Sequence, residues 1–255
     1  MKYRAEITKT EQLTEAAAIA DFEYIYAPME FFCAGKDSVF PTAMNELDKP
    51  RIILIPPVFL GGNESVTAEK LSILRKLGFK NVLAHTLGHI ELIKSAGLNP
   101  CGGFRLNITN SLALKQYEDM ELADGIFSVE LSFVGMKRII RRIPMGFIAY
   151  GKIPLMVTRR CPVKDSKLCG RQGCTELTDR LGNKLQTLCR WGEVEILNPV
   201  PLVVSDKIMD KSADFCVLKF TDENISDILS QYKQNRSPKD MYGKFTRGLY
   251  CERIK

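Results

Sequence analysis

Long hydrophobic runs are missing from this sequence of 255 residues. The longest apolar stretches, such as Ile52–Pro57 and Gly146–Tyr150, are much shorter than the roughly 20 apolar residues that a helix needs to cross a bilayer. The first residues, MKYRAE, lack the apolar core of a secretory signal peptide. The sequence therefore predicts a cytoplasmic protein with no membrane span, in a compartment where disulfides are rare.

Several catalytic signatures are absent as well. No G-x-G-x-x-G follows the first predicted strand, which weighs against a dinucleotide-binding sheet. There is no G-x-S-x-G, and a serine protease triad would have to use one of only two histidines, His85 and His89, which lie in one short stretch. The residue after His85 is threonine, so the glutamate of an H-E-x-x-H zinc protease motif is missing. These protease and dinucleotide-binding classes are disfavoured.

Short apolar runs alternate with amphipathic stretches up to about residue 158. The runs predict strands at Tyr3–Thr8, Phe22–Ala27, Arg51–Pro56, Asn81–His85, Arg105–Ile108, Gly125–Val129 and Gly146–Tyr150. The amphipathic stretches predict helices at Glu11–Ile19, Glu69–Leu77, Leu87–Ser95, Ser111–Met120 and Val134–Arg142. Such alternation is typical of a parallel α/β architecture. Because the dinucleotide-binding motif is absent, we expect an incomplete or irregular (β/α) TIM-type barrel rather than an open sheet.

The pattern changes after residue 158. We expect residues 1–158 to form the barrel-like core and residues 159–255 to form a cysteine-bearing, partly β portion, packed on the same domain. The later elements are predicted to be a hairpin at Thr175–Arg190 that turns at Gly182-Asn183, strands at Glu195–Leu197, Leu202–Val204 and Phe215–Phe220, and a closing helix at Ile225–Lys233.

Four of the eight cysteines fall within one short segment: Cys161, Cys169, Cys174 and Cys189. Even scattering would place about one cysteine there, so the clustering predicts a metal or cluster site. Thiolates suit either an iron–sulfur cluster or zinc. Neither short gap has the C-x2-C form typical of zinc knuckles. A 4Fe–4S cluster is therefore the preferred cofactor, with zinc as the alternative.

Basic residues gather around these cysteines in a chain of net charge +6. They suit an anionic partner such as RNA or a small phosphorylated or carboxylate substrate, although a solvated basic face would look the same. Arg159 and Arg160, just before Cys161, are the candidate substrate-binding residues. Neighbours on a strand point to opposite faces, so we expect at most one of the two to reach the site.

Polar residues at or just past predicted strand ends are candidate catalytic groups, because barrel enzymes collect their chemistry there. They are His85, Asn107 or Asn110, Glu130 and Tyr150. Glu130 follows an apolar run where burial would raise its pKa, which suits a general acid–base. The alternative role is a carboxylate that caps or pairs with the following helix. His85 is either a proton carrier or a structural histidine.

Residues 150–162 read YGKIPLMVTRRCP and resemble the YGxxPLMxxxxCP signature of the collagenase-like peptidases of unknown catalytic type, peptidase family U number thirty-two. Four further segments resemble motifs of this family in the same order. They are residues 128–132 (SVELS), 177–182 (LTDRLG), 196–202 (ILNPVPL) and 245–248 (FTRG). The resemblance is strongest over residues 105–205.

The resemblance implies a TIM-type barrel and identifies the four clustered cysteines as the ligands of a 4Fe–4S cluster. Some members of the family look like oxygen-independent hydroxylases that act on tRNA or rRNA bases or on a quinone precursor. We therefore predict an iron–sulfur-dependent, oxygen-independent hydroxylase or modification enzyme acting on RNA bases. The alternatives are a collagenase-like peptidase and a non-catalytic iron–sulfur partner of a paralogous subunit.

Overall fold

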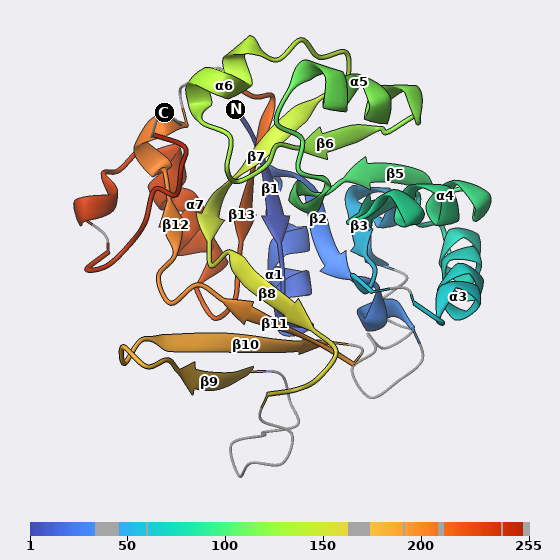
Figure 1. Ribbon diagram of the computed structural model, residues 1–255, viewed down its shortest axis with the longest axis horizontal. Coiled ribbons are helices and arrows are strands. Elements are labelled where there is room, and N and C mark those ends of the chain that lie inside the picture. Colours follow the sequence, from blue (N-terminus) through green and yellow to red (C-terminus); the bar gives the residue numbers. More distant parts are fainter. Residues whose placement is uncertain are drawn as a thin grey trace.

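Eight parallel strands close into a barrel (Figure 1). The computed structural model describes residues 1–33, 46–59, 61–162, 174–190, 192–208, 212–240 and 242–251, with backbone only for residues 174, 175 and 240. The barrel strands are β1 (Lys2–Glu6), β2 (Phe22–Pro28), β3 (Ile52–Ile55), β4 (Asn81–Ala84), β5 (Asn99–Gly102), β6 (Asp124–Ile126), β7 (Met145–Gly151) and β13 (Phe215–Lys219). β6 pairs with β7, and β13 lies between β7 and β1, so the ring has no open edge. The predicted TIM-type barrel is confirmed, and it is complete.

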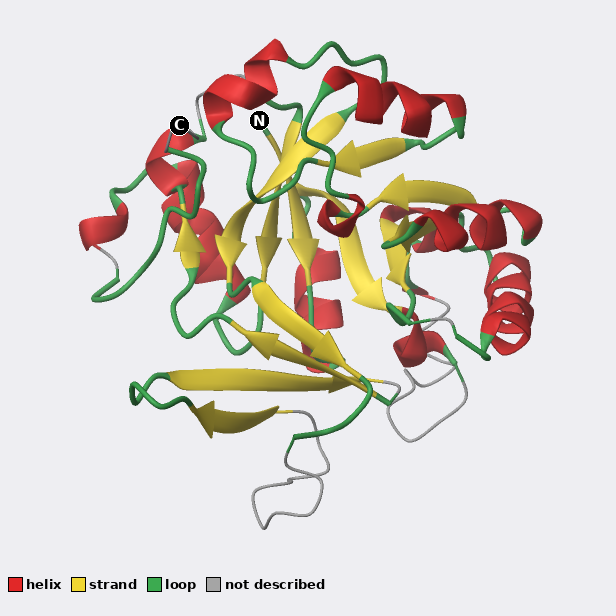
Figure 2. Ribbon diagram, viewed as in Figure 1, coloured by secondary structure: helices red, strands yellow, loops and turns green. Residues whose placement is uncertain are grey.

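Helices surround this barrel and follow most of its strands (Figure 2). They are α1 (Glu11–Ala18), α3 (Glu64–Lys76), α4 (Leu87–Ser95), α5 (Ser111–Asp119), α6 (Phe133–Arg138) and α7 (Ile225–Lys233). Short 3₁₀ turns are η1 (Met29–Phe32), η2 (Lys49–Arg51), η3 (Phe104–Leu106), η4 (Ser205–Lys207) and η5 (Pro238–Asp240). Within the described ranges, no helix combines the length and hydropathy that a membrane crossing requires.

The barrel strands are rich in apolar residues because side chains cover both of their faces. Every residue of β7 and every residue of β3 is buried. The outer helices bury one stripe each, as with Leu71 and Leu74 of α3, and leave their charged residues in solvent. Apolar runs therefore marked most of the strands, and amphipathic spacing marked the helices between them.

One predicted strand is wrong. The fifth strand is Asn99–Gly102, whereas the predicted strand Arg105–Ile108 begins within the 3₁₀ turn η3. The sequence did not predict β5 because it contains proline and glycine, and both residues are depleted in strand interiors. A Cβ on Gly102 would stand 3.3 Å from the Gly125 Cα of the neighbouring strand, which explains why a glycine fits here.

A second, antiparallel sheet is inserted between the seventh and eighth barrel strands. This cap sheet has the order β8-β11-β10-β9. Its strands are β8 (Pro154–Thr158), β9 (Cys174–Thr178), β10 (Lys184–Arg190) and β11 (Glu193–Leu197), and β12 (Leu202–Val203) then returns to pair with β7. The arrowheads of β1, β2 and β13 point toward the cap sheet in Figure 1, which places it at the carboxyl ends of the barrel strands.

The barrel extends beyond residue 158, where the sequence indicated the end of the core. Its eighth strand, β13, comes from residues 215–219, and the strand after β7 already belongs to the cap sheet. The predicted hairpin is confirmed as β9 and β10, joined through a turn in which Asp179 accepts a hydrogen bond from the Asn183 backbone at 2.9 Å. The C-terminal portion is thus partly β, and one of its strands completes the core.

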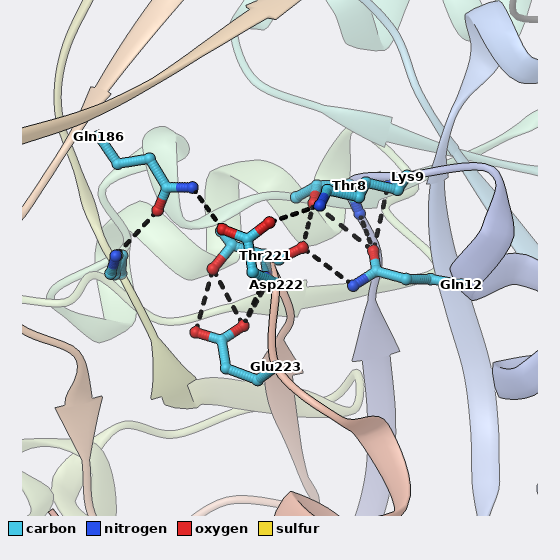
Figure 3. A network of polar contacts seen from close by, with 8 residues as sticks. Thr8, Lys9, Gln12, Gln186, Thr221, Asp222 and Glu223 are labelled. Atoms are coloured by element: carbon cyan, nitrogen blue, oxygen red, sulfur yellow. Dashed lines mark hydrogen bonds and ion pairs between the residues drawn. The ribbon is translucent and has the colours of Figure 1, made fainter. Parts of the chain in front are cut away.

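A polar network ties the cap sheet to the barrel (Figure 3). Gln186 of β10 donates to the Asp222 carboxylate at 2.7 Å and accepts from Lys152 Nζ at 2.8 Å. On the barrel side, Gln12 of α1 donates to the Thr221 carbonyl at 3.1 Å. Thr221 and Asp222 lie just after β13, and Gln12 lies on α1, which follows β1. This network therefore joins the cap sheet to the segments that follow the last and the first barrel strands.

Candidate active site

The carboxyl mouth of the barrel contains a cavity of about 40 Å³ that the cap sheet covers. Barrel residues from several strand ends line its floor, namely Glu6, Pro28, Ile55, Leu83, His85, Ile126 and Lys219. Cap residues line its roof: Leu188, Arg190, Glu193 and Glu195. Carboxyl strand ends are where TIM-barrel enzymes place their reacting groups. This mouth cavity is therefore the candidate active site.

Charged pairs are buried around the mouth cavity. Glu6 at the end of β1 pairs with Lys219 at the end of β13, and both side chains are at most 9% exposed. Arg105, in the η3 turn, donates to Glu195 of β11 at 2.6 Å. Buried ion pairs of this kind are a poor route to stability, because desolvation offsets most of the attraction between the charges. Such a cluster at a strand-end cavity points to function.

Two carboxylates on β11 experience opposite environments. Burial raises the pKa of Glu195, but the positive charges of Lys219, Arg190 and Arg105 outweigh it and lower that pKa to about 2. Burial raises the pKa of Glu193, and its backbone hydrogen bonds only partly oppose the rise. Glu193 accepts from the Val58 and Phe59 amides at 2.9 and 2.8 Å. Glu195 is therefore a fixed anion, and Glu193 is the carboxylate that protonates more readily.

Several buried polar atoms at the mouth have no hydrogen-bond partner among the described residues. They are both ring nitrogens of His85, Nε of Arg105, Nη2 of Arg190 and Oε2 of Glu195. Burial, with the nearby Arg105 charge, lowers the pKa of His85 well below its usual range, so its ring is neutral at pH 7. Buried polar groups are nearly always satisfied in proteins, so this group of unpartnered atoms sets the mouth apart from most of the described interior.

The structure separates the predicted catalytic residues. His85 lines the mouth cavity, whereas Glu130, Asn110 and Tyr150 do not. Glu130 is exposed, with its backbone amide donating to Ser128 Oγ at 3.2 Å. Asn110 caps α5 by accepting from the Ala113 amide at 2.8 Å.

Tyr150 is a core residue of β7. It is 1% exposed, and its ring lies about 6 Å from those of Phe220, Tyr232 and Tyr242. Burial raises its pKa well above the usual value, because the phenolate form is disfavoured there. The side chain therefore contributes to packing between β7 and the C-terminal elements.

Arg159 and Arg160 are both exposed beyond the end of β8. The Arg159 guanidinium lies 5.3 Å from the ring centre of Phe59 and donates to the Gly61 carbonyl at 3.4 Å. Phe59 is the residue whose amide binds Glu193. Arg159 therefore belongs to the rim of the mouth, while the Arg160 backbone is held by Thr158 Oγ1 at 3.2 Å.

Strand pairing gathers three of the four clustered cysteines at one end of the cap sheet. Cys189 of β10 pairs with Val194, which pairs with Thr158 at the end of β8, three residues before Cys161. The Cys174 backbone lies opposite Leu188, next to Cys189. Cys169 lies outside the described residues.

Cys161 is half-buried and Cys189 is exposed. The described side chains include only these two of the four predicted ligands, and within that part of the chain no three His, Cys, Asp or Glu residues form a metal-binding group. The next residue after Cys189 is Arg190, which lines the mouth cavity. Leu188 also lines that cavity, so alternation along β10 places the exposed Cys189 side chain on the opposite, outer face of the cap sheet.

Sequence reasoning missed most of the charged residues at the mouth. Lys219 ends the apolar strand β13 and Glu6 ends β1, and the strand-end position was a usable signal for both. Arg105 was assigned to a strand that does not exist, and Glu193 and Glu195 belong to an inserted sheet whose place over the barrel is set by long-range packing. No local pattern in β11 shows that it faces a cavity.

Matches to known proteins are remote. No family model matches this chain, and no curated protein matches it. A solved structure described as the U32 peptidase Mk0906 is similar at 8% identity with a TM-score of 0.49, over 88% of this chain and 94% of that chain. The fold assignment therefore rests on the strand pairings of this chain itself.

Proposed function

We propose that this protein is an iron–sulfur-dependent, oxygen-independent hydroxylase that modifies a base of tRNA or rRNA at the barrel mouth. The observation that carries the proposal is the position of the cysteine end of the cap sheet. Cys189 lies between Leu188 and Arg190, which both line the cavity, so its side chain is on the outer face of the sheet that covers the cavity. The proposal therefore rests on a cap sheet that carries three of the four cysteine positions at one end and covers a strand-end pocket rich in buried charge.

The donor set suits the proposed cofactor. Cys161, Cys169, Cys174 and Cys189 would hold a 4Fe–4S cluster through four thiolates, the usual ligands of such clusters. The cluster would supply one-electron transfer, which the protein's own side chains cannot provide. The described backbone supports this set, because three of the four positions share one end of the cap sheet. Zinc remains the alternative metal.

The mouth residues would bind and shield the base. The lining combines a neutral histidine with fixed charges, while the cap sheet limits the access of bulk water. Exposed Arg159 and Arg160 lie outside the cavity, where RNA phosphates would remain in solvent. In this proposal the base lies at the opening of the mouth cavity, and the RNA backbone lies outside it.

The lining disfavours the covalent peptidase alternative. Among the described residues that line the mouth cavity there is no serine, threonine or cysteine. A covalent peptidase uses such a nucleophile with an adjacent base. Gelatin cleavage by the purified protein that survives loss of the metal would nevertheless favour a peptidase.

The test begins with iron and acid-labile sulfide analysis on protein purified without oxygen. We expect about four of each per chain, lost in Cys161→Ala and retained in Cys251→Ala, a variant of an exposed cysteine outside the predicted set. One zinc and no sulfide, or no metal at all, would contradict the proposal.

The second part of the test is mass spectrometry of nucleosides from cells that lack the gene. We expect one nucleoside to lose the mass of one oxygen atom, with return of the modification on complementation by the wild-type gene but not by Cys161→Ala. Unchanged RNA together with a cluster-bearing protein that co-purifies with a second subunit would instead indicate a non-catalytic partner.

A further inference from the structure

The cap sheet is joined to the barrel through one narrow stem. The chain enters the cap from β7 and leaves it toward β12, which pairs with β7. Between these strands the Asn198 amide donates to the Ile153 carbonyl at 2.9 Å, so the two connections lie side by side. The contacts of Gln186 with Lys152 and Asp222 belong to the same side, because Lys152 follows β7 and Asp222 follows the neighbouring strand β13. The cap sheet therefore rises from the barrel on a two-stranded stem at β7.

The far end of the cap sheet contacts the opposite side of the barrel. Glu193, at the end of β11 away from the stem, accepts from the Val58 and Phe59 amides in the segment after β3. Arg159, just past β8, donates to the Gly61 carbonyl in the same segment. In the closed ring, three strands separate β3 from β7 in either direction. The cap sheet thus spans the mouth, from the stem at β7 to these hydrogen bonds of Glu193 and Arg159, which we call the latch.

Apolar packing does not continue from the barrel into the cap sheet. Among the described residues, four buried apolar side chains lie outside the main hydrophobic core, and all four belong to the cap sheet: Leu188, Val194, Ile196 and Leu197. Every other buried apolar side chain of the described chain belongs to that core. A shared apolar core is the main force that holds packed elements together. Polar contacts, which exchange for contacts with water, hold the cap sheet instead, so it can separate while the barrel stays folded.

The closed cap leaves little room at the mouth. The cavity of about 40 Å³ holds only a few water molecules. The unpartnered polar atoms around it belong to both sides of the contact: His85 and Arg105 on the barrel, Arg190 and Glu195 on the cap sheet. Opening would expose these atoms to water, and closing removes them from it, so closure carries a desolvation cost. The closed position therefore depends on the contacts that hold the cap sheet down.

We propose that the cap sheet is a lid that swings on the β7 stem and controls access to the mouth cavity, with Glu193 as the main residue of its latch. Opening breaks the hydrogen bonds of Glu193 and Arg159 to the segment after β3, together with the Arg105–Glu195 pair. The contacts beside the stem lie near the hinge, where the displacement is smallest. This inference concerns access alone, so it stands or falls independently of the reaction proposed for the cavity.

The experiment measures how fast N-ethylmaleimide labels a thiol placed under the lid of the full-length protein. Leu83 lines the cavity and is 4% exposed. Trypsin releases residues 81–94 as one peptide that contains no native cysteine, so mass spectrometry of this peptide reports the labelling of Leu83→Cys alone. If this variant does not fold, Ile126→Cys replaces it, because Ile126 lines the same cavity and lies in the cysteine-free tryptic peptide 116–137.

The reference is the native thiol of Cys216, which is buried in the barrel strand β13. We expect the introduced thiol to react at least about tenfold faster than Cys216, because opening a lid costs less free energy than unfolding the barrel. Glu193→Ala should raise the rate of the introduced thiol at least about tenfold further, without a matching rise at Cys216, because two hydrogen bonds to a carboxylate are lost. Glu176→Ala, which removes a cap-sheet glutamate paired with exposed Lys184, is the matched control and should change neither rate.

Three results would overturn the inference. Equal rates at the introduced thiol and at Cys216 would mean that the mouth opens only when the barrel unfolds. A rate as high as that of exposed Cys251 would mean that the cap sheet does not close the mouth. An unchanged rate in Glu193→Ala would mean that Glu193 does not act as a latch. None of these rates depends on turnover, so a failed hydroxylation assay would leave the lid intact and would refute only the hydroxylase.

Discussion

Gly151 marks the point where β7 leaves the barrel, and its backbone φ of +116° is a conformation that L side chains rarely adopt. A Cβ at this position would stand 2.3 Å from the Lys219 carbonyl oxygen, which is backbone and has little freedom to move. Lys219 in turn pairs with Glu6 at the mouth. The absence of a side chain at residue 151 thus allows β7 and β13 to approach closely beside the candidate active site.

We expect Gly151→Ala to lower the free energy of unfolding by about 3 kcal/mol or more, because strain and a backbone clash combine. Gly182→Ala is the matched control: its φ is +81°, but no atom lies within 4 Å of the added Cβ. Strain alone should cost it about 1 kcal/mol. Urea unfolding of the two variants checks this, and equal losses would show that the close approach at Lys219 does not matter.

At the scale of elements, Glu193 connects the cap sheet to the barrel. Its carboxylate accepts from two successive amides, those of Val58 and Phe59, in the segment that follows β3. A single side chain of β11 therefore holds one part of the barrel rim against the cap. Glu176 of the neighbouring strand β9 instead pairs with exposed Lys184, away from the rim.

We expect Glu193→Ala to speed hydrogen exchange at the Val58 and Phe59 amides at least tenfold, because both lose their acceptor. Glu176→Ala should leave these two amides unchanged. Exchange measured by NMR at neutral pH distinguishes the variants. Unaltered protection in Glu193→Ala would mean that other contacts hold the rim.

Local patterns were sufficient for most elements, as α4 and α7 show by starting and ending where the amphipathic spacing predicted. They failed at β5, where Pro100 and Gly102 resemble a loop. They also failed at the site. Tyr150 ends a predicted strand yet lies in the core, whereas Glu195 lies in an insertion and lines the mouth. Long-range packing decides which strand ends face a cavity. The spacing of residues along the chain therefore does not predict it.

At the scale of the whole molecule, several buried groups make folding sensitive to acid. Burial lowers the pKa of His89 from 6.5 to about 4, and it also lowers that of His85. The pKa of Glu195 falls from 4.5 to about 2. In each case the unfolded chain binds a proton at a higher pH than the folded protein does, so the free energy of unfolding decreases as the pH falls. Glu193, with its raised pKa, acts in the opposite direction and offsets part of the effect.

We expect the free energy of unfolding to drop between pH 6.5 and pH 4, with His89 contributing about 3 kcal/mol at most. A further drop from Glu195 follows between about pH 4.5 and pH 2. Urea titrations at a series of pH values measure both. His89→Gln, which keeps an acceptor for the His85 amide, should flatten the first drop; an identical profile in this variant would count against the assignment.

The place of β13 in the barrel has a consequence for biosynthesis. About 70 residues separate the end of β7 at Gly151 from the end of β13 at Lys219. A ribosome adds roughly 5–20 residues per second, so this segment takes several seconds to emerge. During this time the nascent chain contains seven of the eight barrel strands. The edges of β1 and β7 that pair with β13 in the finished barrel have no partner strand yet. The cap strands are made in that interval. The Glu6–Lys219 pair, which joins the first barrel strand to the last, therefore forms only when the growing chain closes the ring.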